Sequence, residues 1–297
     1  MKTAFLYLHI SILFAGFTGV FGRLITLNEA LLVWYRVMFA SCFFLMYFAA
    51  KKINFLLPLK DMLRIAWLGL LLAIHWVLFY ASIKMSNVSI GVLCIASLCF
   101  FTAILDPLMS HRRFCWRELL FSLLTLAGIA SIFHFDSRYQ AGIVVGLLSA
   151  FVCSVMTIET RRISQSYPLT TFLFYQIASC FAIMTLALPV WLHFVPVDTI
   201  LPSLKNLVYL LLMASFCTVG MFVFQVEALK RLSAFTVNLS YNLEPIYSII
   251  IAMILFNEAS EVNASFYVGL VLIGTSVGLQ TLMHYKSNQR LAGSKKA

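Results

Sequence analysis

The sequence predicts an all-α integral membrane protein with ten transmembrane helices, arranged as two inverted five-helix repeats. Composition, the lengths of the apolar runs and the placement of basic residues lead to this prediction. Of the 297 residues, 62% are hydrophobic and only 11% are charged, and the mean hydropathy is +0.95. A soluble globule of this size needs more polar side chains than that to cover its surface. Most of the surface therefore faces lipid.

Ten apolar runs have the length that a membrane span requires. A hydrocarbon core of about 30 Å is crossed by about 20 helical residues. The first run follows closely on Met1 and resembles a signal peptide, but a second apolar run begins almost at once, so we interpret the first as a retained span. The expected spans are 4–22, 30–49, 62–83, 88–110, 116–134, 141–159, 169–192, 206–228, 234–256 and 264–284.

Lysine and arginine are distributed unevenly between the two sides of the predicted membrane. With the N-terminus inside, sixteen of the 21 basic residues lie in cytoplasmic segments, four lie outside and Arg36 lies within a span. Basic residues in short loops stay on the cytoplasmic side. We therefore expect a multi-pass protein of the inner (plasma) membrane with both termini in the cytoplasm. The net charge of +10 then complements anionic lipid headgroups and does not require nucleic acid as a partner.

Two stretches of the first half recur in weaker form in the second half. Residues 34–43 resemble residues 174–181, and residues 81–105 resemble residues 228–252. Each half then holds five spans, and because five is odd, the second half enters the membrane from the opposite side. The expected units are a first repeat, a second repeat and a basic cytoplasmic tail, at residues 1–138, 139–286 and 287–297.

Glu244 is the strongest candidate for a functional residue. It lies about halfway along the ninth span, where an ionised group costs roughly 3 kcal/mol or more to insert. Pro245 follows it and lacks the backbone N–H that the carbonyl near Tyr241 would bind, which predicts a kink that lines a cavity. The alternative is that Glu244 pairs with a structural partner. Three other carboxylates lie near the cytoplasmic ends of spans, where we expect them to pair with basic residues: Asp106, Glu159 and Glu227.

A polar stripe surrounds Glu244 on the ninth span. Its members recur at three- and four-residue spacing, which places them on a common face of a helix: Asn238, Tyr241, Asn242, Pro245 and Ser248. Such a face points into the bundle, where it either lines a cavity or holds helices together. We favour the cavity because the stripe lies at mid-span.

Arg36 lies about a third of the way into the second span, beside Tyr35. Its planar guanidinium suits a substrate carboxylate. It also suits a structural role, which we favour, either paired with Glu29 on the same face or extended outward to the headgroups. The matching position of the other half holds Gln176, beside Tyr175, so the fold does not require a charge there.

The third span carries a polar and aromatic group at mid-membrane, away from the interfaces where aromatic belts normally lie. Its members are His75, Trp76, Phe79 and Tyr80. An aromatic wall of this kind can stack a flat or apolar substrate, and His75 can join a proton relay with Glu244. The alternative for all of them is ordinary packing.

Several short motifs of the chain resemble one family. They lie at residues 17–22, in Val33-Trp34-Tyr35-Arg36, in Phe174-Tyr175-Gln176, at residues 228–234, in Leu243-Glu244-Pro245 and in Phe256-Asn257-Glu258. Together they resemble the drug/metabolite transporter superfamily, in particular its bacterial EamA-type branch, over almost the whole chain. The resemblance implies two inverted five-helix repeats around a central cavity and movement of small metabolites, often export of amino acids. The fourth span departs from the family pattern, because Ser97-Leu98-Cys99 lacks the proline that the family has near this point.

The expected function is therefore secondary transport, by alternating access, of small metabolites such as amino acids or related amphiphilic compounds, in the direction of export. The sequence has no phosphate-binding glycine-rich loop, so the energy comes from an ion or substrate gradient, with protons as one candidate. An alternative is a translocase of lipids or lipid-linked sugars. The chain contains no HExxH or GxSxG motif and no paired intramembrane aspartates, so we expect no enzyme, and a membrane-embedded enzyme is only a minor alternative.

The seven cysteines form no CxxC pair and no Cys/His cluster, so we expect no metal site and no cofactor. The expected partners are a small-molecule substrate and the lipid bilayer, and the sequence leaves a homodimer open. The candidate substrate-binding residues are Glu244, Tyr241, Asn242, Asn238, Trp76, Tyr80, His75, Arg36, Tyr175 and Gln176.

Overall fold

A computed structural model describes residues 2–111, 139–197 and 199–256, together with scattered residues of 114–127 and 268–279. Every regular element in the described ranges is helical. The helices are α1 (Lys2–Leu24), α2 (Glu29–Lys51), α3 (Leu59–Met85), α4 (Val88–Ile95), α5 (Leu98–Ser110), α7 (Gln140–Ile163), α8 (Leu169–Phe194), α9 (Leu204–Ala214), α10 (Met221–Leu229), α11 (Ala234–Tyr241) and α12 (Glu244–Phe256). A 3₁₀ turn (Ser164–Ser166) follows α7, and a π-helical turn (Ser215–Gly220) joins α9 to α10.

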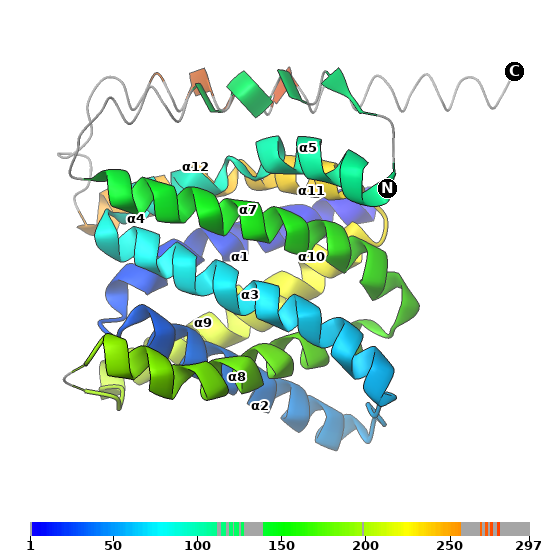
Figure 1. The fold of residues 1–297 in the computed structure, drawn as a ribbon, viewed down its shortest axis with the longest axis vertical. Coiled ribbons are helices and arrows are strands. Elements are labelled where there is room, and N and C mark those ends of the chain that lie inside the picture. The colour runs from blue at the N-terminus through cyan, green and yellow to red at the C-terminus, as the bar shows by residue number, and fades with distance from the viewer. Residues whose placement is uncertain are drawn as a thin grey trace, which may run out of the picture.

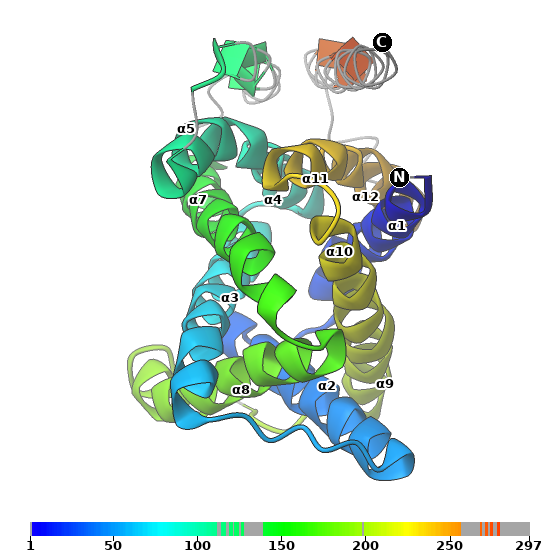
Figure 2. The same ribbon diagram turned by 90° about the vertical axis from the view of Figure 1, so that its right-hand side faces the viewer.

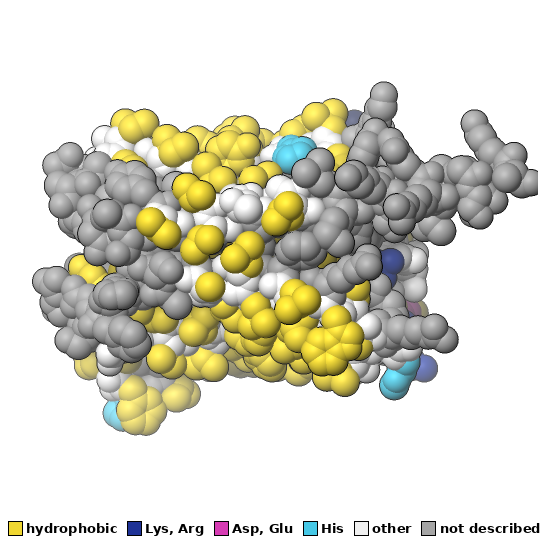
Figure 3. Space-filling model, turned by 90° about the horizontal axis from the view of Figure 1, so that it is seen from above, with side chains coloured by type: hydrophobic (Ala, Val, Ile, Leu, Met, Phe, Trp, Pro, Cys, Tyr) yellow, Lys and Arg dark blue, Asp and Glu magenta, His cyan; other side chains and the backbone are white. Residues whose placement is uncertain are grey.

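Eight helical stretches among the described residues are long and apolar enough to cross a membrane. They coincide closely with eight of the ten spans expected from the sequence, and the other two, 116–134 and 264–284, lie largely outside the described residues. The surface agrees with a lipid environment, because large apolar side chains such as Leu186 and Leu204 are about four-fifths exposed, at 80% and 79%. Figure 3 shows that hydrophobic side chains are the most frequent of the coloured kinds on one face. The chain is a multi-pass membrane protein.

The helices of the two halves pack in a reciprocal way. The third span of the first half, α3, packs on α7 and α8 of the second half. The matching span of the second half packs on the first half in the same way, because α10 packs on α1 and α9 packs on α2. Likewise α5 packs on α7, and α12 packs on α1. Figures 1 and 2 show the result: α3 and α7 face α9 and α10 across the molecule, with α2 and α8 at one end and α5 and α11 at the other.

Two spans are broken, and their breaks correspond. The fourth span consists of an eight-residue α4 and a 13-residue α5, and the ninth consists of an eight-residue α11 and a 13-residue α12. Both begin with a capped turn, in which Asn87 accepts from the backbone N–H of Ile90 and Ser233 accepts from that of Thr236. The caps align Asn87 with Ser233, whereas the sequence match of residues 81–105 with residues 228–252 aligns Ser86 with Ser233. The two alignments differ by one residue. The broken spans also lie side by side in opposite directions, because α4 packs on α12 and α5 packs on α11.

The first break forms without a proline. The ninth span kinks next to Pro245 as expected, and in the fourth span the chain turns at Ala96 and Ser97 instead. There the N–H groups of both residues bond three residues back, to Leu93 and Cys94, and the Ser97 hydroxyl donates to the Cys94 carbonyl at 2.6 Å. The serine and the tight turn thus satisfy backbone groups that a continuous helix would pair four residues apart.

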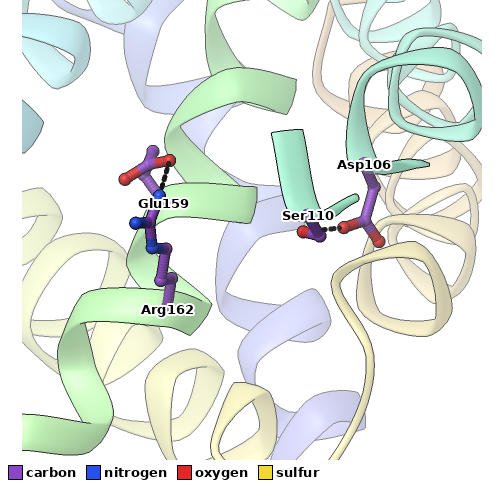
Figure 4. Close-up of polar contacts among 4 residues, drawn as sticks. All are labelled: Asp106, Ser110, Glu159 and Arg162. Atoms are coloured by element: carbon purple, nitrogen blue, oxygen red, sulfur yellow. Dashed lines mark hydrogen bonds and ion pairs between the residues drawn. The ribbon is translucent and has the colours of Figure 1, made fainter. Parts of the chain in front are cut away.

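Polar contacts gather at the membrane end that the sequence assigns to the cytoplasm. Glu159 pairs with Arg162 at 3.5 Å, and the Ser110 hydroxyl donates to Asp106 at 2.8 Å (Figure 4). A third carboxylate, Glu227, pairs with Lys230 at 3.7 Å. The expected pairing of Glu159 and Glu227 with basic neighbours is confirmed.

A contact between the halves lies at the same end. The Tyr167 hydroxyl, in the turn before α8, donates to the Asp61 carboxylate of α3 at 2.7 Å. This hydrogen bond to a carboxylate raises the pKa of Tyr167, which lies outside the spans.

Candidate functional site

A small cavity lies at the centre of the bundle. Its volume is about 60 Å³, and its walls come from helices of both halves, namely α1, α2, α3, α4, α5, α7, α10, α11 and α12. Six of the ten residues expected to bind substrate line it: Arg36, His75, Trp76, Asn238, Tyr241 and Glu244. The cavity is thus lined by one arginine and one glutamate, with aromatic and amide side chains between them.

Arg36 is fully buried, and its guanidinium is held from several directions. Nε donates to the Thr218 hydroxyl at 2.6 Å, Nη1 to the Tyr80 hydroxyl at 2.5 Å, and Nη2 to the Cys217 carbonyl at 2.5 Å. The guanidinium carbon also lies 3.7 Å from the centre of the Trp76 ring, at cation–π distance. Arg36 therefore neither extends outward to the headgroups nor uses these donors on Glu29.

The π-helical turn between α9 and α10 provides two of these acceptors. The Thr218 hydroxyl donates a hydrogen bond to the Met213 carbonyl, five residues back, at 3.1 Å. Its oxygen is then free to accept from Arg36. Such single-turn π-helical insertions are often found at functional sites, because they displace the backbone from the regular ladder. Here the turn brings the second half of the chain into contact with an arginine of the first.

His75 and Trp76 form one wall of the cavity on α3. His75 Nδ1 lies 2.8 Å from the Ser149 hydroxyl of α7, which itself donates to the His75 carbonyl at 2.8 Å. Trp76 contacts Arg36 on one side and Phe222 on another, with ring centres 5.8 Å apart. His75 and Glu244 border the same cavity, as a proton relay requires.

The residues of the polar stripe on the ninth span line the cavity, form hydrogen bonds to other helices, or do both. Tyr241 and Asn238 border the cavity, and each also makes a contact with another helix. The Tyr241 hydroxyl donates to Ser11 of α1 at 3.2 Å, and the Asn238 amide donates to Thr102 of α5 at 2.8 Å. Ser248 faces α1, where its hydroxyl donates to the Gly16 carbonyl at 2.6 Å. The stripe therefore lines the cavity and holds helices together.

Glu244 is the first residue of α12, directly after the break, and is 6% exposed. Its carboxyl borders the cavity that Arg36 also borders. The break places this side chain there, because α12 begins at Glu244 directly after the turn at Asn242 and Leu243.

Four expected binding residues lie away from the cavity lining. Tyr80 is behind Arg36 and accepts its hydrogen bond. The Asn242 amide donates to the Cys99 sulfur at 3.3 Å, and the Tyr175 hydroxyl accepts from the Leu57 N–H at 3.3 Å. Gln176 is a fully buried residue of α8, at the contact with α3, and neither atom of its amide has a hydrogen-bond partner among the described residues.

The cavity also contains polar residues that were not expected from the sequence. Gln225 of α10 and Thr18 of α1 line it, and Thr218 anchors Arg36 from just outside. A search for intramembrane charges misses them, because they are uncharged. The signal that identifies Gln225 is an isolated amide inside an otherwise apolar span.

Fold and site together define a class: a multi-pass helical membrane protein in which two sets of helices enclose a charged cavity. The family model described as "EamA-like transporter family" matches residues 2–134 and again residues 140–279. The chain belongs to the EamA-like transporter family.

Two individual proteins resemble the chain, one in sequence and one in fold. A protein of Clostridium kluyveri (strain ATCC 8527 / DSM 555 / NBRC 12016 / NCIMB 10680 / K1), named only as an uncharacterized transporter, is 24% identical over 182 residues. That match covers 59% of this chain and just over half of the relative, 56% of its length. A solved crystal structure has the same fold with a TM-score of 0.72 at 14% identity, over 96% of this chain and 99% of the other.

Proposed function

We propose that the chain is a secondary transporter of the inner membrane that exports small metabolites, such as amino acids or related amphiphilic compounds, by alternating access. The observation that carries the proposal is the pair of opposite charges, Arg36 and Glu244, on one cavity between the two halves. Charged side chains in a membrane core are costly and mark substrate or ion pathways. Transporters of this kind bind substrate near the midplane, beside discontinuous helices.

The two halves are proposed to be inverted five-helix repeats, residues 1–138 and 139–286, with ten spans in all. The equal lengths of the broken helices, the reciprocal packing and the double match of the family model support this arrangement. The charge bias of the loops supports a cytoplasmic location for both termini.

The present arrangement corresponds to a closed stage of the cycle. A cavity of about 60 Å³ holds water but lies far below the 300 to 1,000 Å³ of ordinary ligand pockets. At the end opposite Asp61 and Tyr167, the Asn206 amide donates to the Thr26 hydroxyl at 3.0 Å and joins the two halves. Opening toward either side then requires one of these two contacts to separate.

The function is tested with purified protein in proteoliposomes. Counterflow of labelled amino acids, nucleosides and drugs is measured with and without a pH gradient, and labelled phospholipid analogues are followed in parallel. We expect protein-dependent movement of at least one class of small metabolite. Scrambling of phospholipid without any metabolite flux would instead indicate a lipid translocase.

Glu244→Gln tests the site. Because the carboxamide cannot exchange a proton, we expect the variant to lose transport or to move solute without responding to the pH gradient, while its elution profile and melting temperature stay close to those of the original protein. Glu227→Gln is the matched control, since Glu227 pairs with Lys230 at the membrane end, away from the cavity. Normal pH-driven flux in Glu244→Gln would remove this residue from the mechanism.

A further inference from the structure

The net charge of the groups that border the central cavity depends on whether Glu244 is protonated. This inference rests on the proposed function and concerns what the cavity binds. Arg36 is charged at every accessible pH, and its donors go to neutral acceptors, namely two hydroxyls and a carbonyl. In the part of the chain that the structure describes, no carboxylate forms an ion pair with it. Its positive charge is therefore available to act across the cavity.

Glu244 is the carboxyl that shares the cavity with Arg36, and it approaches from the other half of the chain. The other titratable groups on the walls are His75 of α3, Cys153 of α7 and Tyr241 of α11, with Tyr80 and Cys217 in contact with Arg36. With Glu244 ionised, the Arg36–Glu244 pair has no net charge. With Glu244 protonated, the pair carries one positive charge.

These two states differ in what they bind. Coulomb interactions are stronger in a small cavity enclosed by protein than in bulk water, so an anion next to an ionised Glu244 is strongly disfavoured. Once Glu244 takes up a proton, Arg36 alone faces the cavity and favours a single negative charge. A cation finds no complementary state, because ionised Glu244 is already balanced by Arg36.

We propose that the cavity binds compounds with one anionic group, such as a carboxylate or sulfonate, with Arg36 as the anchor and one proton bound to Glu244 for each anion. The proton comes from water on the loading side and leaves Glu244 on the releasing side when the anion leaves Arg36. Anion and proton thus move together in the same direction, so the outward gradient of the anion drives their export. The pair is neutral, so the step carries no net charge across the membrane.

Binding is measured on the full chain in detergent micelles over a range of pH. The probes are methanesulfonate and benzoate, with dimethyl sulfone and benzamide as neutral analogues and benzylamine as the cation. Linkage predicts that anion affinity falls by about tenfold per pH unit once Glu244 ionises. Methanesulfonate stays ionised throughout, so its slope reports the protein. The neutral probes should show no slope.

Three variants locate the effect. Glu244→Gln should bind the anions with a flat pH profile, and Arg36→Gln should lose the preference for anions over their neutral analogues by tenfold or more. His75→Gln should keep the slope, which separates the histidine from the glutamate. If the slope persists in Glu244→Gln, or if benzylamine binds better than benzoate, the proposal is wrong.

Transport supplies an independent readout. Proteoliposomes that contain a pH dye are exposed to an inward methanesulfonate gradient, and we expect the lumen to acidify at a rate that an imposed membrane potential does not change. Flux of methanesulfonate without acidification, or strong voltage dependence, overturns the coupling. If no probe anion binds but other labelled metabolites move, this inference fails and the transporter function stands. If no solute moves at all, the proposed function itself fails.

Discussion

Thr218 positions Arg36 through one short hydrogen bond between helices of different halves. In Thr218→Val the branched shape is kept, but the buried Nε–H loses its acceptor, which costs about 1 to 3 kcal/mol. We therefore expect a lower melting temperature in detergent and weaker anion binding. Thr218→Ser, which keeps the hydroxyl, should restore most of both. If Thr218→Val melts and binds like the original protein, Thr218 does not position Arg36.

At the scale of single residues, the sequence predicts which side chains matter better than it predicts what they contact. Arg36 and Glu244 are identified because a charge in a span is costly. The partners of Arg36 are not, since Thr218 lies 182 positions away and resembles any other threonine in an apolar run. Gln176 was expected at the site from its place opposite Arg36, yet it lies on α8 at the contact with α3. Matching positions in two repeats need not face the same cavity.

At the scale of elements, span lengths follow from hydropathy, whereas irregularities inside spans follow it only in part. Pro245 predicts the break before α12, because proline cannot donate to the helix ladder. The break at Ala96 and Ser97 has no such residue, and the π-helical turn Ser215–Gly220 has no sequence signal of its own. Both depend on packing against distant helices, which a single sequence does not reveal.

The packing of the two broken spans against each other leads to a crosslinking prediction. Asn242, in the break of the ninth span, lies 3.3 Å from the sulfur of Cys99 at the start of α5. In a chain whose other six cysteines are replaced by alanine, Asn242→Cys should form a disulfide with Cys99 under mild oxidation, detectable by mass spectrometry of linked peptides. Because the bond ties the two breaks together, we expect transport to stop and to return on reduction.

Two outcomes would count against this arrangement of the breaks. Absence of the disulfide would mean that the breaks do not meet as the structure places them. Full transport by the oxidised, crosslinked chain would mean that they do not separate during the cycle. The matched control is the same cysteine background with Asn242 unchanged, which cannot form the bond and should be insensitive to oxidant.

At the scale of the whole molecule, the lipid environment makes prediction easier. A span must be long, helical and apolar, so eight of the ten expected spans agree closely with the described helices. The relation between the halves is harder to predict, because a few matching residues around Tyr35 and Tyr175 indicate a repeat but not how the halves pack. The reciprocal contacts of α3 with α8 and of α9 with α2 appear only in three dimensions.

The orientation of the whole bundle is a prediction from charge that labelling can test. The predicted topology places sixteen basic residues on one side and four on the other, and such a bias sets the direction of insertion. Lys51 ends α2 on the side assigned to the cytoplasm, and Lys205 lies in the first turn of α9 on the opposite side; both are exposed. In a chain without its native cysteines, Lys205→Cys should react with a membrane-impermeant maleimide in spheroplasts.

Lys51→Cys provides the complementary measurement. It should react with the same maleimide only in inside-out vesicles, and reaction of both variants after detergent treatment is the control for accessible thiols. The reverse pattern would place both termini outside. The charge bias makes the cytoplasmic location of Lys51 the expected result, because reversing the bundle would move most of its lysines and arginines across the membrane against the positive-inside preference.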